Sequence, residues 1–240
     1  MALEPRQPLV LAHRGDHHRW IENTADALLD ALLLPGVDGV EFDVRVAADG
    51  EPVILHDESL QRTFGVPLLA RNERSVALEA RGVPHLARML SLLPENAFLD
   101  VELKDVASPA TYAALRDARG ERFHRGVISS FQAPILAEVR ARQPRWPAWL
   151  NAVTLDRFSI AAARTIGCRG IAAHWSSVNA GSVRAARDAG LEIAVWTIRR
   201  RATRTRVERL GVDVVIVEGP ALESAAAYEP LVGVVPATPG

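Results

Sequence analysis

The chain of 240 residues has very little cysteine, no excess of charge of either sign and no long apolar run. Its one cysteine, Cys168, excludes a disulfide framework and any zinc site built from several cysteines. A net charge of −1 argues against a general nucleic-acid-binding protein, because such a protein needs a basic excess. No segment approaches the roughly 20 apolar residues of a membrane helix, and the first residues lack the basic and apolar regions of a secretory signal. We therefore expect a cytoplasmic protein with no integral membrane segment.

Lysine is the scarcest charged residue of the chain. The 28 basic residues comprise 27 arginines and a single lysine, Lys104. Hydrophobic residues make up 48% and charged residues 24%, which is typical of a soluble globular fold. In a chain that uses arginine nearly everywhere, the one lysine marks a candidate position at which arginine would not serve.

Short β-rich runs alternate with helical runs that are rich in alanine and arginine. The expected strands are 8–12, 37–46, 52–56, 97–103, 126–130, 147–151, 170–174, 191–197 and 213–217. The expected helices are 23–34, 109–119, 134–142, 157–166, 180–189 and 201–210. Strands that alternate with helices of this length indicate βα units and a parallel sheet.

Nine strands are one too many for a (β/α)8 barrel, a TIM barrel, which otherwise suits the length. The segment 47–51 is too short for a helical crossover, and its Asp49-Gly50 pair favours a tight antiparallel hairpin. We therefore expect an α/β fold in which residues 1–240 form a single TIM-barrel domain, with a rim insertion at about 47–95 and a C-terminal tail at 228–240. An open doubly wound sheet is the alternative, but no glycine-rich nucleotide loop follows any strand.

Polar residues that can carry chemistry gather at the strand ends. His13 ends the first strand, while Glu41 and Asp43 lie on the second. Glu102 and Lys104 lie on a later strand. Residues two apart on a strand point to the same face, which in a barrel is the interior, and the C-terminal strand ends form the active-site rim.

The hairpin should return His56 to the level of Asp43, so that a histidine lies beside the acidic residues. Three carboxylates, from Glu41, Asp43 and Glu102, would then converge, and they cannot all stay ionised without a compensating cation or protons. Carboxylate oxygens suit Mg²⁺ or Ca²⁺. A divalent metal, two titratable imidazoles and the nearby cations Arg14 and Lys104 suit the cleavage of a phosphodiester.

A series of motifs resembles the glycerophosphodiester phosphodiesterase family, which belongs to the phosphatidylinositol-phospholipase-C-like superfamily. The motifs run in order along nearly the whole chain: His13-Arg14-Gly15, Glu22-Asn23-Thr24, 38–44, 49–57, Leu60-Gln61-Arg62-Thr63, Pro84-His85-Leu86, 101–104, Ser130-Phe131, Trp196-Thr197 and Gly211-Val212-Asp213.

The resemblance implies a TIM barrel that hydrolyses small-molecule glycerophosphodiesters to an alcohol and glycerol 3-phosphate with one divalent metal ion, Mg²⁺ or Ca²⁺, with Mn²⁺ as a further candidate. The roles that it implies are acid/base catalysis for His13 and His56, metal binding for Glu41, Asp43 and Glu102, phosphate or substrate binding for Arg14 and Lys104, and an aromatic pocket wall for Trp196. We favour His13 as the base and His56 as the acid. The nucleophile is either water or the glycerol 2-hydroxyl of the substrate.

The sequence departs from the family pattern at Ile21, His85, Arg199 and the stretch Val217-Glu218-Gly219-Pro220. These departures affect specificity for the alcohol more than the chemistry. One alternative is a lysophospholipase D that acts on lipid-tailed substrates, and another is a non-catalytic barrel that binds phosphate ligands. The sequence identifies no protein partner.

Other polar residues have structural interpretations. Asn23 is expected to cap the first helix, Asp57 to orient a neighbouring group and Asp100 to be buried. The remaining histidines are expected at the surface or rim: His17, His18, His85, His124 and His174.

Overall fold

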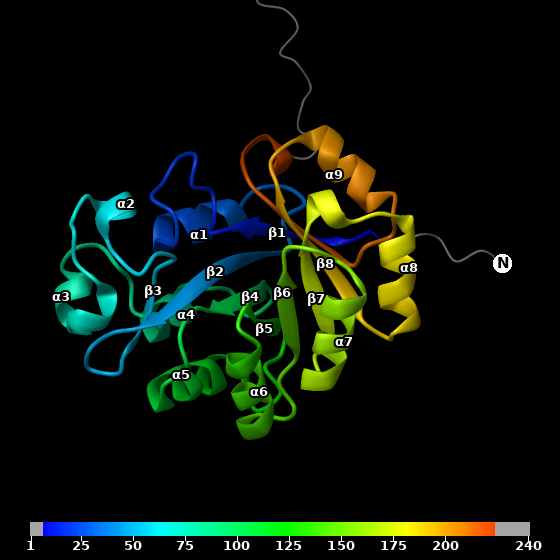
Figure 1. Cartoon of the computed structure of the whole chain (residues 1–240). Coiled ribbons are helices and arrows are strands. Elements are labelled where there is room, and N and C mark those ends of the chain that lie inside the picture. The colour runs from blue at the N-terminus through cyan, green and yellow to red at the C-terminus, as the bar shows by residue number, and fades with distance from the viewer. Residues whose placement is uncertain (1–6, 224–240) are drawn as a thin grey trace, which may run out of the picture.

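The computed structural model describes residues 7–223, so the expected tail at 228–240 lies outside them. Eight parallel strands close into a barrel, which confirms the expected (β/α)8 fold (Figure 1). They are β1 (Leu9–His13), β2 (Gly39–Val46), β4 (Phe98–Leu103), β5 (Gly126–Ser130), β6 (Ala148–Ala152), β7 (Gly170–His174), β8 (Glu192–Ile198) and β9 (Val214–Val217). The barrel closes because β1 pairs with both β9 and β2.

The ninth strand, β3 (Pro52–Ile54), is antiparallel to β2, as the Asp49-Gly50 hairpin predicts. β1 pairs with β2 only as far as Glu41, whereas β3 pairs with β2 from Val44 to Val46. The hairpin therefore rises above the barrel rim and brings the following residues back towards it.

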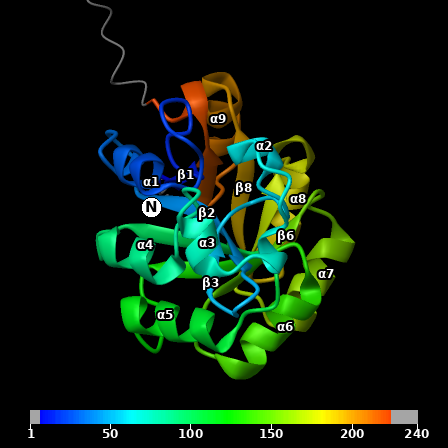
Figure 2. The ribbon, with the colours of Figure 1, turned by 90° about the vertical axis from the view of Figure 1, so that its left-hand side faces the viewer.

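Helices surround the strands, and Figure 2 shows them as a ring. The ring consists of α1 (Ala25–Leu32), α4 (Leu86–Leu92), α5 (Pro109–Arg119), α6 (Ala133–Arg142), α7 (Arg157–Ile166), α8 (Ala180–Asp188) and α9 (Arg201–Glu208). Their apolar faces pack on the outward-facing residues of the strands and form the largest hydrophobic core. Short 3₁₀ turns follow β7 (η2, Trp175–Ser177) and β9 (η3, Gly219–Ala221).

The rim insertion, residues 47–95, has two parts. Its first part folds as α2 (Gln61–Phe64), η1 (Ala70–Asn72) and α3 (Ser75–Glu79) around a small apolar core of its own. Its last part supplies α4, whose Leu86, Met89 and Leu90 are buried in the barrel's main core. The rim therefore gains a small separate subdomain, while α4 completes the ring of helices.

The barrel interior is apolar at one end and polar at the other. Leu11, Trp149, Ala194 and Ile216 belong to a separate apolar cluster from the N-terminal and middle parts of the strands. Towards the C-terminal ends, the same inward-facing positions carry His13, Glu41, Asp43, Glu102 and Asn151. The residues expected to share a face therefore meet inside the barrel.

The expectation that Asn23 caps the first helix is wrong. α1 begins at Ala25, and its cap is Thr24, whose hydroxyl accepts a hydrogen bond from the Ala27 backbone N–H. Asn23 instead has a left-handed backbone with φ 62° and is buried. Among residues 7–223, no helix has the length and apolar character needed to cross a membrane.

Candidate active site

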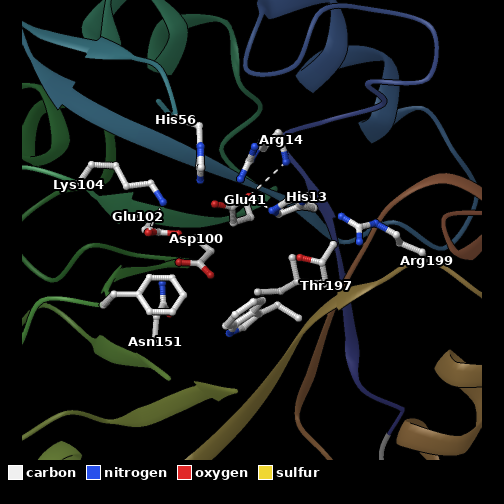
Figure 3. A pocket seen from close by; sticks show the side chains of 13 residues that line it. His13, Arg14, Glu41, His56, Asp100, Glu102, Lys104, Asn151, Thr197 and Arg199 are labelled. Atoms are coloured by element: carbon white, nitrogen blue, oxygen red, sulfur yellow. Dashed lines mark hydrogen bonds and ion pairs between the residues drawn. The ribbon is translucent and has the colours of Figure 1, made fainter. Parts of the chain in front are cut away.

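A cavity of about 260 Å³ opens at the C-terminal ends of the strands (Figure 3). Its lining residues include seven of the eight predicted site residues: His13, Arg14, Glu41, His56, Glu102, Lys104 and Trp196. The eighth, Asp43, is fully buried between Arg14 and Lys104. The fold thus brings together side chains that are up to 183 positions apart in the sequence (13 to 196).

Three carboxylates form a buried acidic cluster beside the cavity. Glu41, Asp43 and Glu102 each offer an oxygen, and these oxygens lie within 4.8 Å of one another. β2 and β4 place them there, because Asp43 is directly opposite Glu102 in the parallel register. Burial, together with the charges of Asp43 and Glu102, raises the pKa of Glu41 well above its usual range. Burial and the nearby Asp43 charge likewise raise the pKa of Glu102 to about 7.

Asp43 is different, because two cations contact it. Lys104 Nζ lies 3.0 Å from Asp43 Oδ1 and also donates a hydrogen bond to Glu102 Oε1. Arg14 Nε lies 3.1 Å from Asp43 Oδ2. Although burial acts in the opposite direction, Lys104 and then Arg14 lower the pKa of Asp43. One member of the acidic cluster is therefore fixed in its ionised form.

Asn23 holds the same carboxylate from the loop before α1. Its side-chain amide donates to Asp43 Oδ2 at 2.9 Å, and its side-chain oxygen accepts from the Asp43 backbone N–H at 3.3 Å. These two hydrogen bonds account for the left-handed backbone of Asn23, since asparagine tolerates this region better than most residues.

His13 is held by a carboxylate that the sequence analysis did not assign. Its Nδ1 lies 2.7 Å from Glu218 Oε2, and Arg199 Nε donates to the other oxygen of Glu218. Despite burial, the hydrogen bond from His13 and the charge of Arg199 lower the pKa of Glu218 to about 2. Because this carboxylate is ionised and can only accept a hydrogen bond, Nδ1 carries the ring proton. Nε2 then carries the lone pair on the cavity side, 3.9 Å from Glu41 Oε2.

His56 has a matching arrangement, and Glu41 lies between the two histidines (Figure 3). Its Nδ1 lies 2.6 Å from Asp57 Oδ1, and Arg62 Nε donates to Asp57 Oδ2 at 2.6 Å. Asp57 thus orients its neighbour, as expected. Each histidine is the end of a chain of histidine, carboxylate and arginine, and each presents Nε2 to the cavity. Burial and then nearby cations lower the pKa of both imidazoles, so the neutral form is favoured.

A network of ion pairs links the rim insertion to the rest of the site. Arg62, from α2, also donates to both oxygens of Glu22, at 2.6 and 2.8 Å. Glu22 in turn accepts from Arg14 Nη1 at 3.0 Å. The position of His56 is therefore coupled through Arg62 and Glu22 to the cation that contacts Asp43.

The remaining wall of the cavity is aromatic and amide-bearing. The indole N–H of Trp196 donates to the Ala172 carbonyl at 2.8 Å, which fixes its ring beside the cavity. Phe131 meets that ring edge to face, with centroids 5.3 Å apart. Asn151 also lines this side, and buried Asp100 lies beside Glu102, where burial raises its pKa to about 7. The cavity therefore has an aromatic side as well as a charged side.

Glu218, Arg62 and Glu22 also belong to the site, although the sequence predicted no role for them. Glu218 had a usable signal, because it follows β9 with the same alternation as Val214 and Ile216, which face the barrel interior. Arg62 and Glu22 lie on short loop and helix segments where alternation does not apply, so their only signal was their place in the motifs Leu60-Gln61-Arg62-Thr63 and Glu22-Asn23-Thr24.

Comparisons with known proteins agree on one family. A model of the glycerophosphoryl diester phosphodiesterase family matches residues 13–222. A glycerophosphodiester phosphodiesterase of Caldanaerobacter subterraneus is 26% identical, with 88% of this chain and 94% of that protein covered.

Solved structures share the fold. A glycerophosphodiester phosphodiesterase from Agrobacterium tumefaciens has a TM-score of 0.76 at 26% identity, covering 90% of this chain and 98% of that one. A phosphodiesterase from Oleispira antarctica, solved with the product sn-glycerol 3-phosphate, has a TM-score of 0.75 at 24% identity, covering 88% and 93%.

Proposed function

Because this chain belongs to the glycerophosphoryl diester phosphodiesterase family, and is therefore an enzyme of the phosphodiesterase class, we propose that it hydrolyses glycerophosphodiesters to an alcohol and sn-glycerol 3-phosphate. We further propose that the reaction depends on a divalent metal ion and on acid/base catalysis by His13 and His56. The Oleispira antarctica relative, which holds sn-glycerol 3-phosphate, supports a small phosphate ester as the ligand of such a site.

The observation that carries the proposal is the paired arrangement of the two histidines. Each imidazole has a carboxylate on Nδ1, and each directs Nε2 into the same cavity, where the acidic cluster lies between them. A carboxylate on Nδ1 fixes the tautomer and stabilises the imidazolium that forms when Nε2 takes a proton. Two such groups that line one cavity can remove one proton and supply another.

The acidic cluster fits a divalent metal ion. Its three carboxylate oxygens are close and buried. Burial and the neighbouring negative charges raise the pKa of Glu41 and of Glu102, and a bound cation would offset that repulsion. Glu41, Asp43 and Glu102 would hold Mg²⁺, Ca²⁺ or Mn²⁺ through oxygen. Such an ion would stabilise negative charge on the phosphoryl oxygens.

The protein's own groups provide the proton transfers and the remaining positive charge. His13 Nε2 takes a proton from the nucleophile, which is water or the glycerol 2-hydroxyl of the substrate. His56 must first take up a proton on Nε2 and become an imidazolium, which Asp57 stabilises, and it then gives that proton to the departing alkoxide. Cleavage breaks the bond between phosphorus and the alcohol oxygen. Arg14 and Lys104 add positive charge at the cavity wall beside the phosphate. Trp196 and Phe131 provide an apolar surface for the carbon atoms of glycerol.

A substrate panel tests this function. We expect the purified protein to release sn-glycerol 3-phosphate from glycerophosphocholine, to lose that activity in EDTA and to regain it when Mg²⁺, Ca²⁺ or Mn²⁺ is added back. His13→Ala and His56→Ala should each lower turnover by about 10²-fold or more, whereas the exposed His124→Ala serves as a matched control. Near-normal turnover by His56→Ala would sink the assignment.

The same panel separates the alternatives. Faster turnover of lysophosphatidylcholine than of glycerophosphocholine would indicate a lysophospholipase D. Metal binding by calorimetry without cleavage of any diester would indicate a binding protein.

A further inference from the structure

A second group of metal-binding side chains lies on the outer side of His13. His13, His17 and Glu218 each offer one ligand atom within 4.8 Å of the other two. Glu218 Oε2 lies 2.7 Å from His13 Nδ1 and 3.6 Å from His17 Nε2. His17 comes from the loop between β1 and α1, and Glu218 follows β9, so the pairing of β1 with β9 brings them together. Two imidazoles and one carboxylate are a common ligand set for Zn²⁺ with three protein ligands and one open position.

The tautomer of His17 suits metal binding. Its Nδ1 lies 3.2 Å from the backbone carbonyl of His13, which can only accept, so Nδ1 must carry a proton. In the neutral ring, the lone pair then lies on Nε2, which is 3.6 Å from the ionised Glu218 oxygen. A lone pair that faces a carboxylate at this distance is repulsive unless a proton or a metal ion lies between them. The hydrogen bond from Nδ1 to a carbonyl is also the outer-shell contact usual for histidine ligands of metals.

The surrounding charges leave the Oε2 side of Glu218 available. Arg199 pairs with the other oxygen, Oε1, and its side chain is mostly exposed, directed towards His13 from the rim (Figure 3). His18 stacks on His17 at 5.7 Å but is not part of the ligand set. The site is nitrogen-rich, unlike the all-carboxylate cluster of Glu41, Asp43 and Glu102. Imidazole ligands favour Zn²⁺ and similar ions over Mg²⁺ and Ca²⁺.

We infer that His13, His17 and Glu218 form a second metal site, which binds Zn²⁺ or a similar transition-metal ion and inhibits the enzyme. An ion on His13 Nδ1 displaces the proton from that nitrogen, so the neutral ring must carry its proton on Nε2. Nε2 then faces the cavity as a donor and cannot take a proton from a nucleophile. The ion also occupies the Glu218 oxygen that stabilises the imidazolium form. The binding site stands on its geometry alone, whereas the inhibition rests on the proposed function.

Zinc titration in saturating Mg²⁺ tests the site, because Mg²⁺ keeps the carboxylate cluster filled. Isothermal calorimetry should show one Zn²⁺ bound by the full-length protein, and His17→Gln should weaken its binding at least about tenfold. The neighbouring variant His18→Gln is the matched control and should bind like the wild type. The visible spectrum of bound Co²⁺ should report nitrogen ligation in the wild type and lose that signature in His17→Gln.

The activity assay tests the inhibition separately. Zn²⁺ should inhibit the wild type and His18→Gln but spare His17→Gln, with the inhibition of each protein measured relative to its own rate without zinc. Equal zinc affinity in the wild type and His17→Gln, or no zinc binding in Mg²⁺, would overturn the site. Zinc binding that depends on His17 but leaves turnover unchanged would overturn the inhibition. If no diester is cleaved at all, the calorimetric and spectroscopic results still decide the site.

Discussion

The chain of His13, Glu218 and Arg199 makes Glu218→Gln an informative substitution, because it keeps the size and removes the charge. Arg199 can only donate hydrogen bonds, so it should take the carbonyl oxygen of the new amide. The amide NH₂ then faces His13 Nδ1, which must accept, and the ring proton moves to Nε2. The substitution therefore places His13 in the wrong tautomer as well as removing the charge that stabilises its imidazolium.

The size of the effect follows from the contact that is lost. A hydrogen bond to a charged group, such as the 2.7 Å contact between His13 and Glu218, contributes about 1.5–3 kcal/mol. Since about 1.4 kcal/mol corresponds to a factor of ten in rate, this loss alone is worth about 10- to 100-fold. The wrong tautomer adds to it, and comparable carboxylate-to-amide changes cost about 10⁴-fold in total. We expect the kcat of Glu218→Gln to fall between about 10²- and 10⁴-fold.

Steady-state kinetics on glycerophosphocholine would measure this, with two companion variants. Arg199→Met alone should change kcat by about fivefold or less, since the Arg199 side chain is 72% exposed and such pairs are weak. The double variant Glu218→Gln/Arg199→Met should be at least about tenfold faster than Glu218→Gln, because the amide is then free to turn its oxygen to Nδ1. A single variant Glu218→Gln within threefold of the wild type, or a double variant with no recovery, would refute this account of His13.

Three further substitutions test other parts of the site and the fold. The hydrogen bond to Asp57 raises the pKa of His56, so Asp57→Ala should lower that pKa. Because an acid must be protonated to act, the alkaline limb of the kcat/KM profile should then move to lower pH. Movement of the acidic limb instead would make His56 the base. Lys104→Arg should lower kcat at least about tenfold despite its equal charge, because a planar guanidinium cannot replace a compact ammonium in that crowded position. If this variant had the kinetics of the wild type, the single lysine would be an accident of composition. Gly15→Ala should destabilise the fold by about 2–4 kcal/mol in urea denaturation. The backbone φ of Gly15 is +81°, and a Cβ there would lie 2.4 Å from the Ala27 carbonyl carbon. An unchanged urea midpoint would contradict the close approach at this position.

The barrel and most of its polar interior could be predicted from the sequence, because both depend on regular geometry. The alternation of Glu41 with Asp43 and of Glu102 with Lys104 fixes which side chains face inward, and the Asp49-Gly50 turn fixes the return of the hairpin. These features are local, so they are visible without knowledge of the packing.

Features that depend on contacts between distant segments were predicted less well. Asparagine is a residue type that often caps helices, yet Asn23 binds Asp43 instead. This contact depends on how β2 lies against the loop before α1. α2 and α3 are too short to show a helical period. α4 does show one, with Leu86, Met89, Leu90 and Leu93 at the right spacing, and could have been found.

The separate core of the rim insertion has a consequence for how the molecule opens. His56 lies between Leu55 and Leu60, both of which are buried in that small cluster rather than in the main barrel core. Regions with fewer buried apolar contacts open in partial unfolding at lower free energy than the whole domain. One of the paired histidines can therefore leave its place while the strands stay intact. On warming, we expect catalysis to fail before the helical circular dichroism signal does, and amide exchange to be faster around His56 than around His13.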